Sequence, residues 1–107
     1  MLEGRLQIYH SGLWGFVCDD YYDHNLARVV CQKLGMGGEG RSVDATPYGN
    51  NTTGRIWLVN PQCSGRETTP SNCFHNGWGS GNCTQTRHVA IVCGGTFSMQ
   101  AYFIVFL

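Results

Sequence analysis

Six cysteines have the most clearly defined chemistry in this chain, because a thiol group either binds a metal ion or forms a disulfide. They are Cys18, Cys31, Cys63, Cys73, Cys83 and Cys93, in a chain of 107 residues. Structural zinc sites usually take their thiolates from close pairs such as CxxC, and no such pair occurs here. We therefore expect three disulfides and an oxidising compartment, although spacing alone leaves the pairing open.

Three Asn-x-Ser/Thr sequons also indicate secretion. They begin at Asn50, Asn51 and Asn82, which are candidate glycosylation sites. We expect an extracellular protein, either secreted or the ectodomain of a membrane receptor.

The adjacent carboxylates of Asp19 and Asp20 are the candidate metal ligands. Two neighbouring carboxylates repel each other without a counter-cation, and calcium prefers several such oxygens around one point. In the alternative, which we favour, both carboxylates accept turn amides and pair with an arginine. We therefore expect no cofactor.

Catalytic groups have little support. Ser80 lies between two glycines, but Trp78 stands where a nucleophile elbow needs its first glycine. The four histidines lack metal-ligand spacing, and turn, helix-start or hydrogen-bonding roles suit them better than the role of a base. Adjacent aspartates point apart and cannot flank a glycosidic bond. We expect no enzymatic activity.

The charges suggest a site that is assembled by folding. Seven Lys and Arg residues balance seven Asp and Glu residues, which argues against a dedicated nucleic-acid-binding protein. The candidate ligand contacts are Arg41, Arg55, Arg66 and Arg87, which are scattered along the chain, and Trp78, which lies between glycines.

Short elements must position these residues. Alternation over 5–9 and the apolar segment 13–18 predict a hairpin around His10-Ser11-Gly12. The spacing of apolar residues predicts a helix from His24 to Leu34, capped by Asp23 and ended by Gly35. Segments 55–59 and 89–93 predict buried strands, whereas 37–53 predicts a long loop. Short strands with one helix indicate an α+β fold.

The two ends of the chain are unusual. The first nine residues contain no apolar run of signal-peptide length, as in an excised fragment. Residues 97–107 are strongly apolar but only about half as long as a membrane span, so we expect no transmembrane segment.

Together, several motifs resemble those of a scavenger receptor cysteine-rich domain. In the first half they are Gly4-Arg5-Leu6-Gln7-Ile8, Trp14-Gly15-x-Val17-Cys18-Asp19-Asp20 and Val29-Val30-Cys31-x-x-Leu34-Gly35. In the second half they are Ile56-Trp57-Leu58, Cys63-Ser64-Gly65-x-Glu67, Cys73-x-His75-x-Gly77-Trp78-Gly79, Asn82-Cys83 and Val92-Cys93. The resemblance covers roughly residues 4–93.

This resemblance implies a curved antiparallel sheet that cradles one helix and is stapled by three disulfides. It implies the pairs Cys18–Cys83, Cys31–Cys93 and Cys63–Cys73, and the six-cysteine group of the family. Metal-binding members carry an acidic residue where this chain has Arg87 or His88, which disfavours calcium. The family's opening strand is missing here, so we expect a domain over 1–95 and an apolar tail, 96–107, that replaces this strand or is exchanged with a second copy as a homodimer.

Two function classes follow from the resemblance. In the first, the chain is a non-catalytic recognition module of a scavenger-type receptor or soluble defence protein, and it binds polyanionic or microbial surface ligands. In the second, it is a protein-protein adhesion module or an accessory domain of a modular protease or oxidase. Salt separates them, because binding to a polyanion weakens steeply as ionic strength rises.

Overall fold

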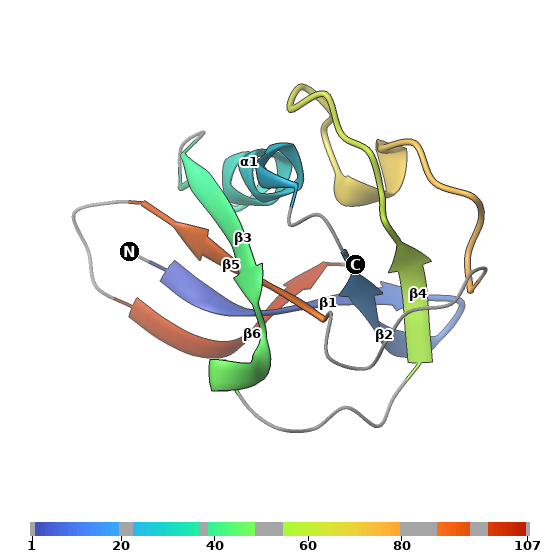
Figure 1. Ribbon diagram of the computed structural model, residues 1–107, viewed down its shortest axis with the longest axis horizontal. Coiled ribbons are helices and arrows are strands. Elements are labelled where there is room, and N and C mark those ends of the chain that lie inside the picture. The colour runs from blue at the N-terminus through green and yellow to red at the C-terminus, as the bar shows by residue number, and fades with distance from the viewer. Residues whose placement is uncertain are drawn as a thin grey trace.

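The computed structural model describes residues 2–19, 23–36, 39–48, 55–79, 88–94 and 99–106. These residues form a curled sheet with one α-helix above it (Figure 1), so the α+β prediction is confirmed. The strands are β1 (Leu2–His10), β2 (Leu13–Cys18), β3 (Gly40–Asp44), β4 (Arg55–Val59), β5 (Val89–Cys93) and β6 (Met99–Phe106). The helix is α1 (His24–Lys33), and the short 3-10 helices are η1 (Thr46–Tyr48) and η2 (Pro70–Asn72).

The predicted hairpin is formed by β1 and β2, which pair antiparallel from Gln7↔Phe16 to His10↔Leu13. Its two-residue turn has positive φ at both Ser11 (52°) and Gly12 (80°). Two consecutive left-handed residues are typical of a type I′ turn, whose twist matches that of the flanking strands.

The sheet is mixed, which corrects the expectation of an antiparallel sheet. The strand order is β3-β5-β1-β2-β4, and β6 pairs with β1 outside this path. β4 runs parallel to β2, and β6 runs parallel to β1. The chain leaves β2, passes through α1 and β3, and returns to β4 in the same direction, which is how a crossover connection produces a parallel pair.

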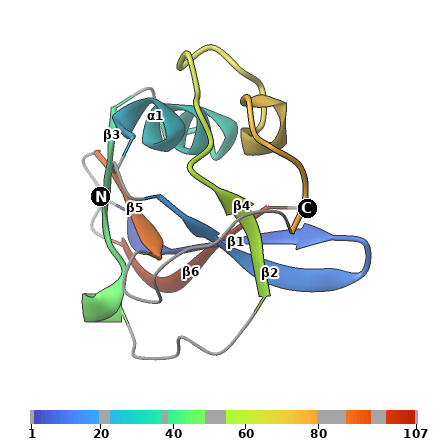
Figure 2. The same cartoon turned by 45° about the vertical axis from the view of Figure 1, so that its right-hand side comes forward.

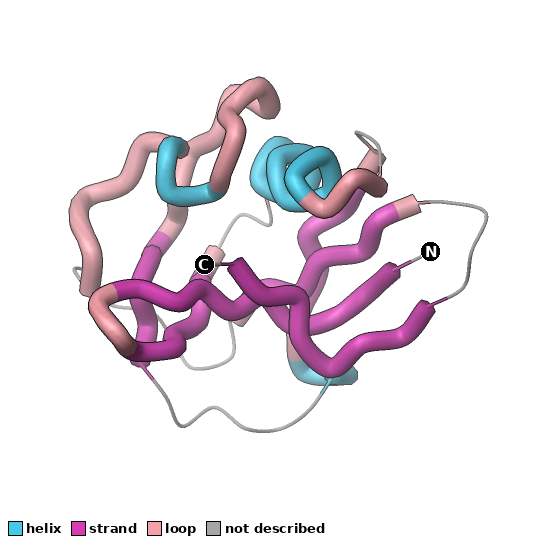
Figure 3. The backbone as a smooth tube through the Cα atoms, turned by 180° about the vertical axis from the view of Figure 1, so that it is seen from behind, coloured by secondary structure: helices cyan, strands magenta, loops and turns pink. Residues whose placement is uncertain are grey.

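β6 lies along most of β1 (Figure 3). Leu2, Glu3 and Arg5 pair with both β5 and β6, so these two strands occupy opposite edges of β1. Without β6 this edge of β1 would present unpaired backbone groups.

Helix α1 packs over the sheet, and Figure 2 shows it beside β3. Asp23 caps its N-terminus by accepting a hydrogen bond from the backbone N–H of Asn25 (2.9 Å). Leu26, Val29 and Val30 are fully buried as predicted, but Leu34 is 37% exposed because it is the C-cap. Gly35 follows with φ +74°, the left-handed conformation that commonly ends a helix.

The loop prediction for 37–53 is wrong, since this segment contains β3 and η1. Its inward-facing residue is Ser42 rather than an apolar residue, which hides the usual alternation of a strand. The Ser42 backbone N–H donates to Nδ1 of His24 (3.1 Å), and the Ser42 hydroxyl donates to the carbonyl of Asp23 (2.7 Å). These bonds satisfy the buried polar groups of β3 at the start of α1.

Two of the three implied disulfides lie within the described residues and are confirmed. Cys31–Cys93 joins α1 to β5, and Cys63–Cys73 closes the loop that leads to η2. The expected Cys18–Cys83 bridge involves Cys83, which lies outside the described residues. Among the residues that the structure describes, we find no helix with the length and apolar character of a membrane span.

Candidate functional site

Four rings from distant parts of the chain meet at the end of the hairpin, and we call them the aromatic cluster: His10, Trp57, His75 and Trp78. The imidazole of His10 lies flat on the indole of Trp78, with centroids 3.7 Å apart and planes 9° apart. Trp57 meets both rings edge-on, at 5.0 Å and 6.0 Å, and His75 meets Trp78 at 5.3 Å. Edge-to-face and stacked geometries are those that aromatic rings prefer.

The cluster is fixed by backbone contacts of Trp57. Its indole N–H donates to the carbonyl of Leu13 (3.0 Å), and its own carbonyl accepts from the N–H of Gly79 (2.9 Å). Gly15 leaves room for the ring, because a Cβ there would lie 2.3 Å from Cδ1 of Trp57. The glycines of the Trp14-Gly15 and Trp78-Gly79 motifs therefore allow the Trp57 indole to pack close to the backbone.

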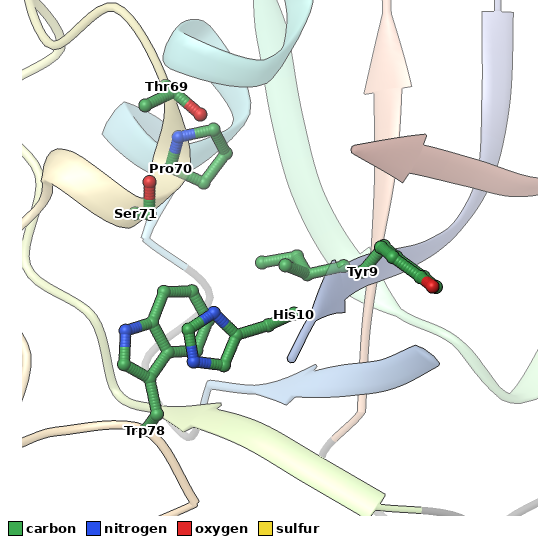
Figure 4. A pocket seen from close by; sticks show the side chains of 7 residues that line it. Tyr9, His10, Thr69, Pro70, Ser71 and Trp78 are labelled. Carbon is green, nitrogen blue, oxygen red and sulfur yellow. The ribbon is translucent and has the colours of Figure 1, made fainter. Parts of the chain in front are cut away.

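A small pocket opens beside the cluster, with a volume of about 140 Å³. Its lining residues are Ile8, Tyr9, His10, Thr69, Pro70, Ser71 and Trp78. Figure 4 shows the overlapping rings of His10 and Trp78 on one side and Thr69, Pro70 and Ser71 on the other, with the Tyr9 side chain pointing away. Trp78 is half-buried. The sequence singled out Trp78 but gave no signal for His10 or for the residues of η2.

Of the candidate arginines, Arg41, Arg55 and Arg66 lie within the described residues, where they are exposed but not gathered in one place. Arg41 lies on β3 and Arg55 on β4, which are at opposite ends of the strand order, with three strands between them. Arg66 lies in the loop after β4, and Arg87 lies outside the described residues. Arg55 also places its guanidinium 5.1 Å from the centre of the Trp57 ring.

Arg28 is an additional exposed cation that the sequence analysis did not single out. A Cβ at Gly65 would lie 3.3 Å from Cδ of Arg28, so this side chain lies against the loop that carries Arg66. Arg28 lies on the polar face of the predicted helix, and this position indicates an exposed cation from the sequence alone.

A second missed group is buried: Arg5 and His88 are each 3% exposed. One guanidinium nitrogen of Arg5 lies 3.2 Å from Nδ1 of His88, and another donates to the carbonyl of Ala45 (3.3 Å). Both side chains pack on the ring of Phe16. Burial lowers the pKa of Arg5, and nearby Asp44 partly offsets this effect. The pKa of His88 is lowered mainly by burial, and the charge of Arg5 lowers it further.

Asp19 is buried, and its carboxylate accepts a hydrogen bond from the backbone N–H of Asp23 (2.6 Å). Asp19 therefore accepts a turn amide, which is one of the contacts expected if the two aspartates do not bind calcium. Asp20 and Arg87 lie outside the described residues, as do the sequons at Asn50, Asn51 and Asn82.

Cys63, Glu67 and Cys73 also bring three potential metal-ligating atoms together, two sulfurs and a carboxylate oxygen. The two sulfurs are bonded to each other, so neither is a free thiolate ligand. The carboxylate of Glu67 instead accepts from the backbone N–H groups of Ser64 and Gly65, and the Ser64 contact is the main cause of its lowered pKa. This group stabilises a loop.

Comparisons with known proteins match this geometry. Residues 1–94 match the model of the scavenger receptor cysteine-rich domain family. The dimeric form of the SRCR domain of mouse MARCO superimposes with a TM-score of 0.74 at 37% identity, covering 86% of each chain. The third SRCR domain of murine neurotrypsin superimposes with a TM-score of 0.67 at 29% identity, covering 85% of this chain and 84% of that chain.

Longer relatives contain this chain as a part. Human CD5 antigen-like is 41% identical over 100 residues, which cover 89% of this chain and 28% of the relative. Human lysyl oxidase homolog 2 is 43% identical over 91 residues, which cover 85% of this chain and 12% of the relative. The chain thus spans a minor part of the relatives that it matches.

Proposed function

Since this chain belongs to the scavenger receptor cysteine-rich family, we propose that it is a recognition module that binds polyanionic or microbial surface ligands. Domains of this family are non-catalytic modules of receptors and secreted proteins outside the cell. Its ligand contacts would be the exposed arginines.

The exposure and charge of these arginines carry the proposal. Within the described part of the chain, the guanidiniums of Arg28, Arg41, Arg55 and Arg66 make no ion pair. A free guanidinium presents planar donors to sulfate, phosphate or carboxylate. Arg41 and Arg55 lie on strands at opposite ends of the strand order, whereas Arg28 lies against the loop that carries Arg66. Cations spread over the fold in this way suit an extended polyanion that touches several points better than one small anion.

The experiment is heparin binding measured over a range of salt concentrations. Wild-type affinity should fall steeply as salt rises, and replacing Arg41, Arg55 or Arg66 by Gln should each weaken binding about fivefold. Gln62→Ala, a change at an exposed uncharged position, is the matched control. Binding that is unchanged by all three arginine variants would contradict the assignment.

A second candidate function is protein-protein adhesion or service as an accessory domain. Tyr9 and Trp14 support it, because they form an exposed aromatic pair with centroids 5.0 Å apart. The match to a small part of lysyl oxidase homolog 2 also favours this role. Binding through such a surface should respond little to salt, and Trp14→Ala should weaken it. The sequence that flanks this domain in its reading frame would separate the two functions. Tandem copies of the domain would favour a receptor, and a neighbouring protease or oxidase would favour the accessory role.

The tail suggests how copies of the chain would associate. We propose that β6 covers β1 either in its own chain or in a second copy, as a homodimer. The pairing of β6 with β1 supports this proposal, as does the dimeric form of the MARCO domain. Deleting residues 96–107 should lower thermal stability or change the mass measured by light scattering. If neither changes, β6 has neither role.

A further inference from the structure

We propose that the pocket beside the aromatic cluster binds a single pyranose ring of a neutral saccharide. This inference goes beyond the polyanion proposal, because none of the four exposed arginines lines the pocket.

The lining has two chemically different sides (Figure 4). One side is aromatic and consists of His10 stacked on Trp78. The other side carries the hydroxyls of Thr69 and Ser71, and neither hydroxyl is hydrogen-bonded to another residue that the structure describes. A pyranose has the matching character, since its C–H faces are apolar and its rim bears hydroxyls. Pockets that combine aromatic surface with a few polar groups are typical of small-molecule sites.

The charge of the lining selects against ions. Among the lining residues that the structure describes, none carries a carboxylate, an ammonium group or a guanidinium. An anionic or cationic ligand would therefore lose hydration without gaining an ion pair, whereas a neutral polyol exchanges water hydrogen bonds for protein ones.

The pocket walls are held in place before any ligand arrives. Trp78 is packed against three other rings of the cluster. On the opposite side η2 is closed by the N–H of Cys73 donating to Pro70 (3.1 Å) and is anchored by the Cys63–Cys73 disulfide. A preformed site avoids much of the entropy cost of ordering side chains on binding.

The volume limits the ligand to one ring. Pockets for drug-sized ligands have volumes of about 300–1,000 Å³, whereas this one has about 140 Å³. A terminal or branching sugar would enter, and the rest of a glycan would remain outside.

The test is an NMR titration of the ¹⁵N-labelled protein with the methyl glycosides of glucose, mannose, galactose and fucose. At least one glycoside should shift the indole N–H signal of Trp78 with a dissociation constant of about 1–10 mM, as expected for about a dozen non-hydrogen atoms. Ser71→Leu, which adds an apolar side chain at the pocket wall, should weaken this binding at least about tenfold. Trp14→Ala, which changes an exposed indole outside the lining, should leave it unchanged.

Heparin binding provides the independent reference. Ser71→Leu should leave heparin affinity and its salt dependence unchanged, whereas Arg41→Gln and Arg66→Gln should leave glycoside binding unchanged. The proposal is overturned if no glycoside shifts the Trp78 signal at about 50 mM, well above the expected dissociation constant. It is also overturned if Ser71→Leu folds normally and binds glycosides as the wild type does, or if only N-acetylproline amide, a peptide probe, shifts the signal.

Discussion

The guanidinium of Arg5 lies 3.2 Å from Nδ1 of His88, although 83 residues separate them in the sequence. An arginine has only donors, so Nδ1 of His88 must accept, and the proton of the neutral imidazole is on Nε2. Protonation at Nδ1 would remove this hydrogen bond and place two buried cations side by side. The pair therefore favours the neutral histidine, in agreement with its lowered pKa.

The first prediction is that stability falls in mildly acidic solution because of His88. Its folded-state pKa lies below the ordinary value of 6.5, so the unfolded chain binds the extra proton first as pH falls. The stabilisation is fully present above about pH 6.5 and is lost progressively below it. Melting temperatures measured from pH 8 to about pH 5 should show this decline, and His88→Gln should make it shallower. Equal slopes for the two proteins would contradict the prediction.

The second prediction is that Arg5→Lys destabilises the fold. Lysine keeps the charge but cannot reach His88 and Ala45 with two separate nitrogens while lying flat over Phe16. We expect a loss of about 1–3 kcal/mol in the free energy of unfolding, measured with urea. Arg41→Lys, on the exposed face of β3, is the control and should change it by less than about 0.5 kcal/mol. Similar values for both variants would mean that the contacts of Arg5 add no stability.

The third prediction concerns the seat of Trp57. Gly15→Ala would place a methyl group 2.3 Å from its Cδ1, so the indole or β2 has to move. We expect a loss of about 1–3 kcal/mol in stability and a changed near-ultraviolet circular dichroism spectrum. Gly94→Ala is a suitable control, since its Cβ would come no closer than 3.4 Å to any atom, and that atom is a carboxylate oxygen of the flexible Glu39 side chain. A fully stable Gly15→Ala protein would show that the cluster repacks freely.

The fourth prediction is that millimolar calcium leaves the melting temperature unchanged. The Asp19 carboxylate already accepts a hydrogen bond from the Asp23 amide. The family resemblance implies an acidic residue in metal-binding members where this chain has Arg87 or His88. Arg87→Glu should restore a third carboxylate and create calcium-dependent stabilisation, whereas Arg66→Glu should not. Clear stabilisation of the unmodified protein by calcium would show that Asp19 and Asp20 still form a metal site.

Local patterns predicted the local elements of this fold. The hairpin and α1 follow from short-range signals, namely the turn at Ser11-Gly12 and the apolar face that begins at Leu26. β3 escaped prediction because its buried residue is Ser42, whose polar groups are satisfied only by contacts with Asp23 and His24. Strand propensity is decided by such tertiary partners.

The candidate sites were only partly predictable for the same reason. Trp78 was identified from its glycine neighbours, but the ring that stacks on it, His10, lies at the far end of the hairpin. Arg5 occupies a polar position in an alternating strand, which gives no sign of burial, yet it is buried because Phe16, Ala45 and His88 cover it. No sequence period encodes contacts of this separation.

The Cys31–Cys93 bridge has a mechanical consequence. When the folded chain is pulled from its two ends, force passes through this covalent bond and bypasses the residues between the two cysteines. The two cysteines are 62 positions apart in the sequence. With the bridge intact, the fully stretched chain is therefore about 200 Å shorter than it would be without the bridge. This bridge leaves β1, before Cys31, and β6, after Cys93, outside the segment that it closes, so tension would first peel β6 and β1 from the sheet. The segment between the two cysteines, which carries β3, β4 and η2, would stay short under a load that extends the rest.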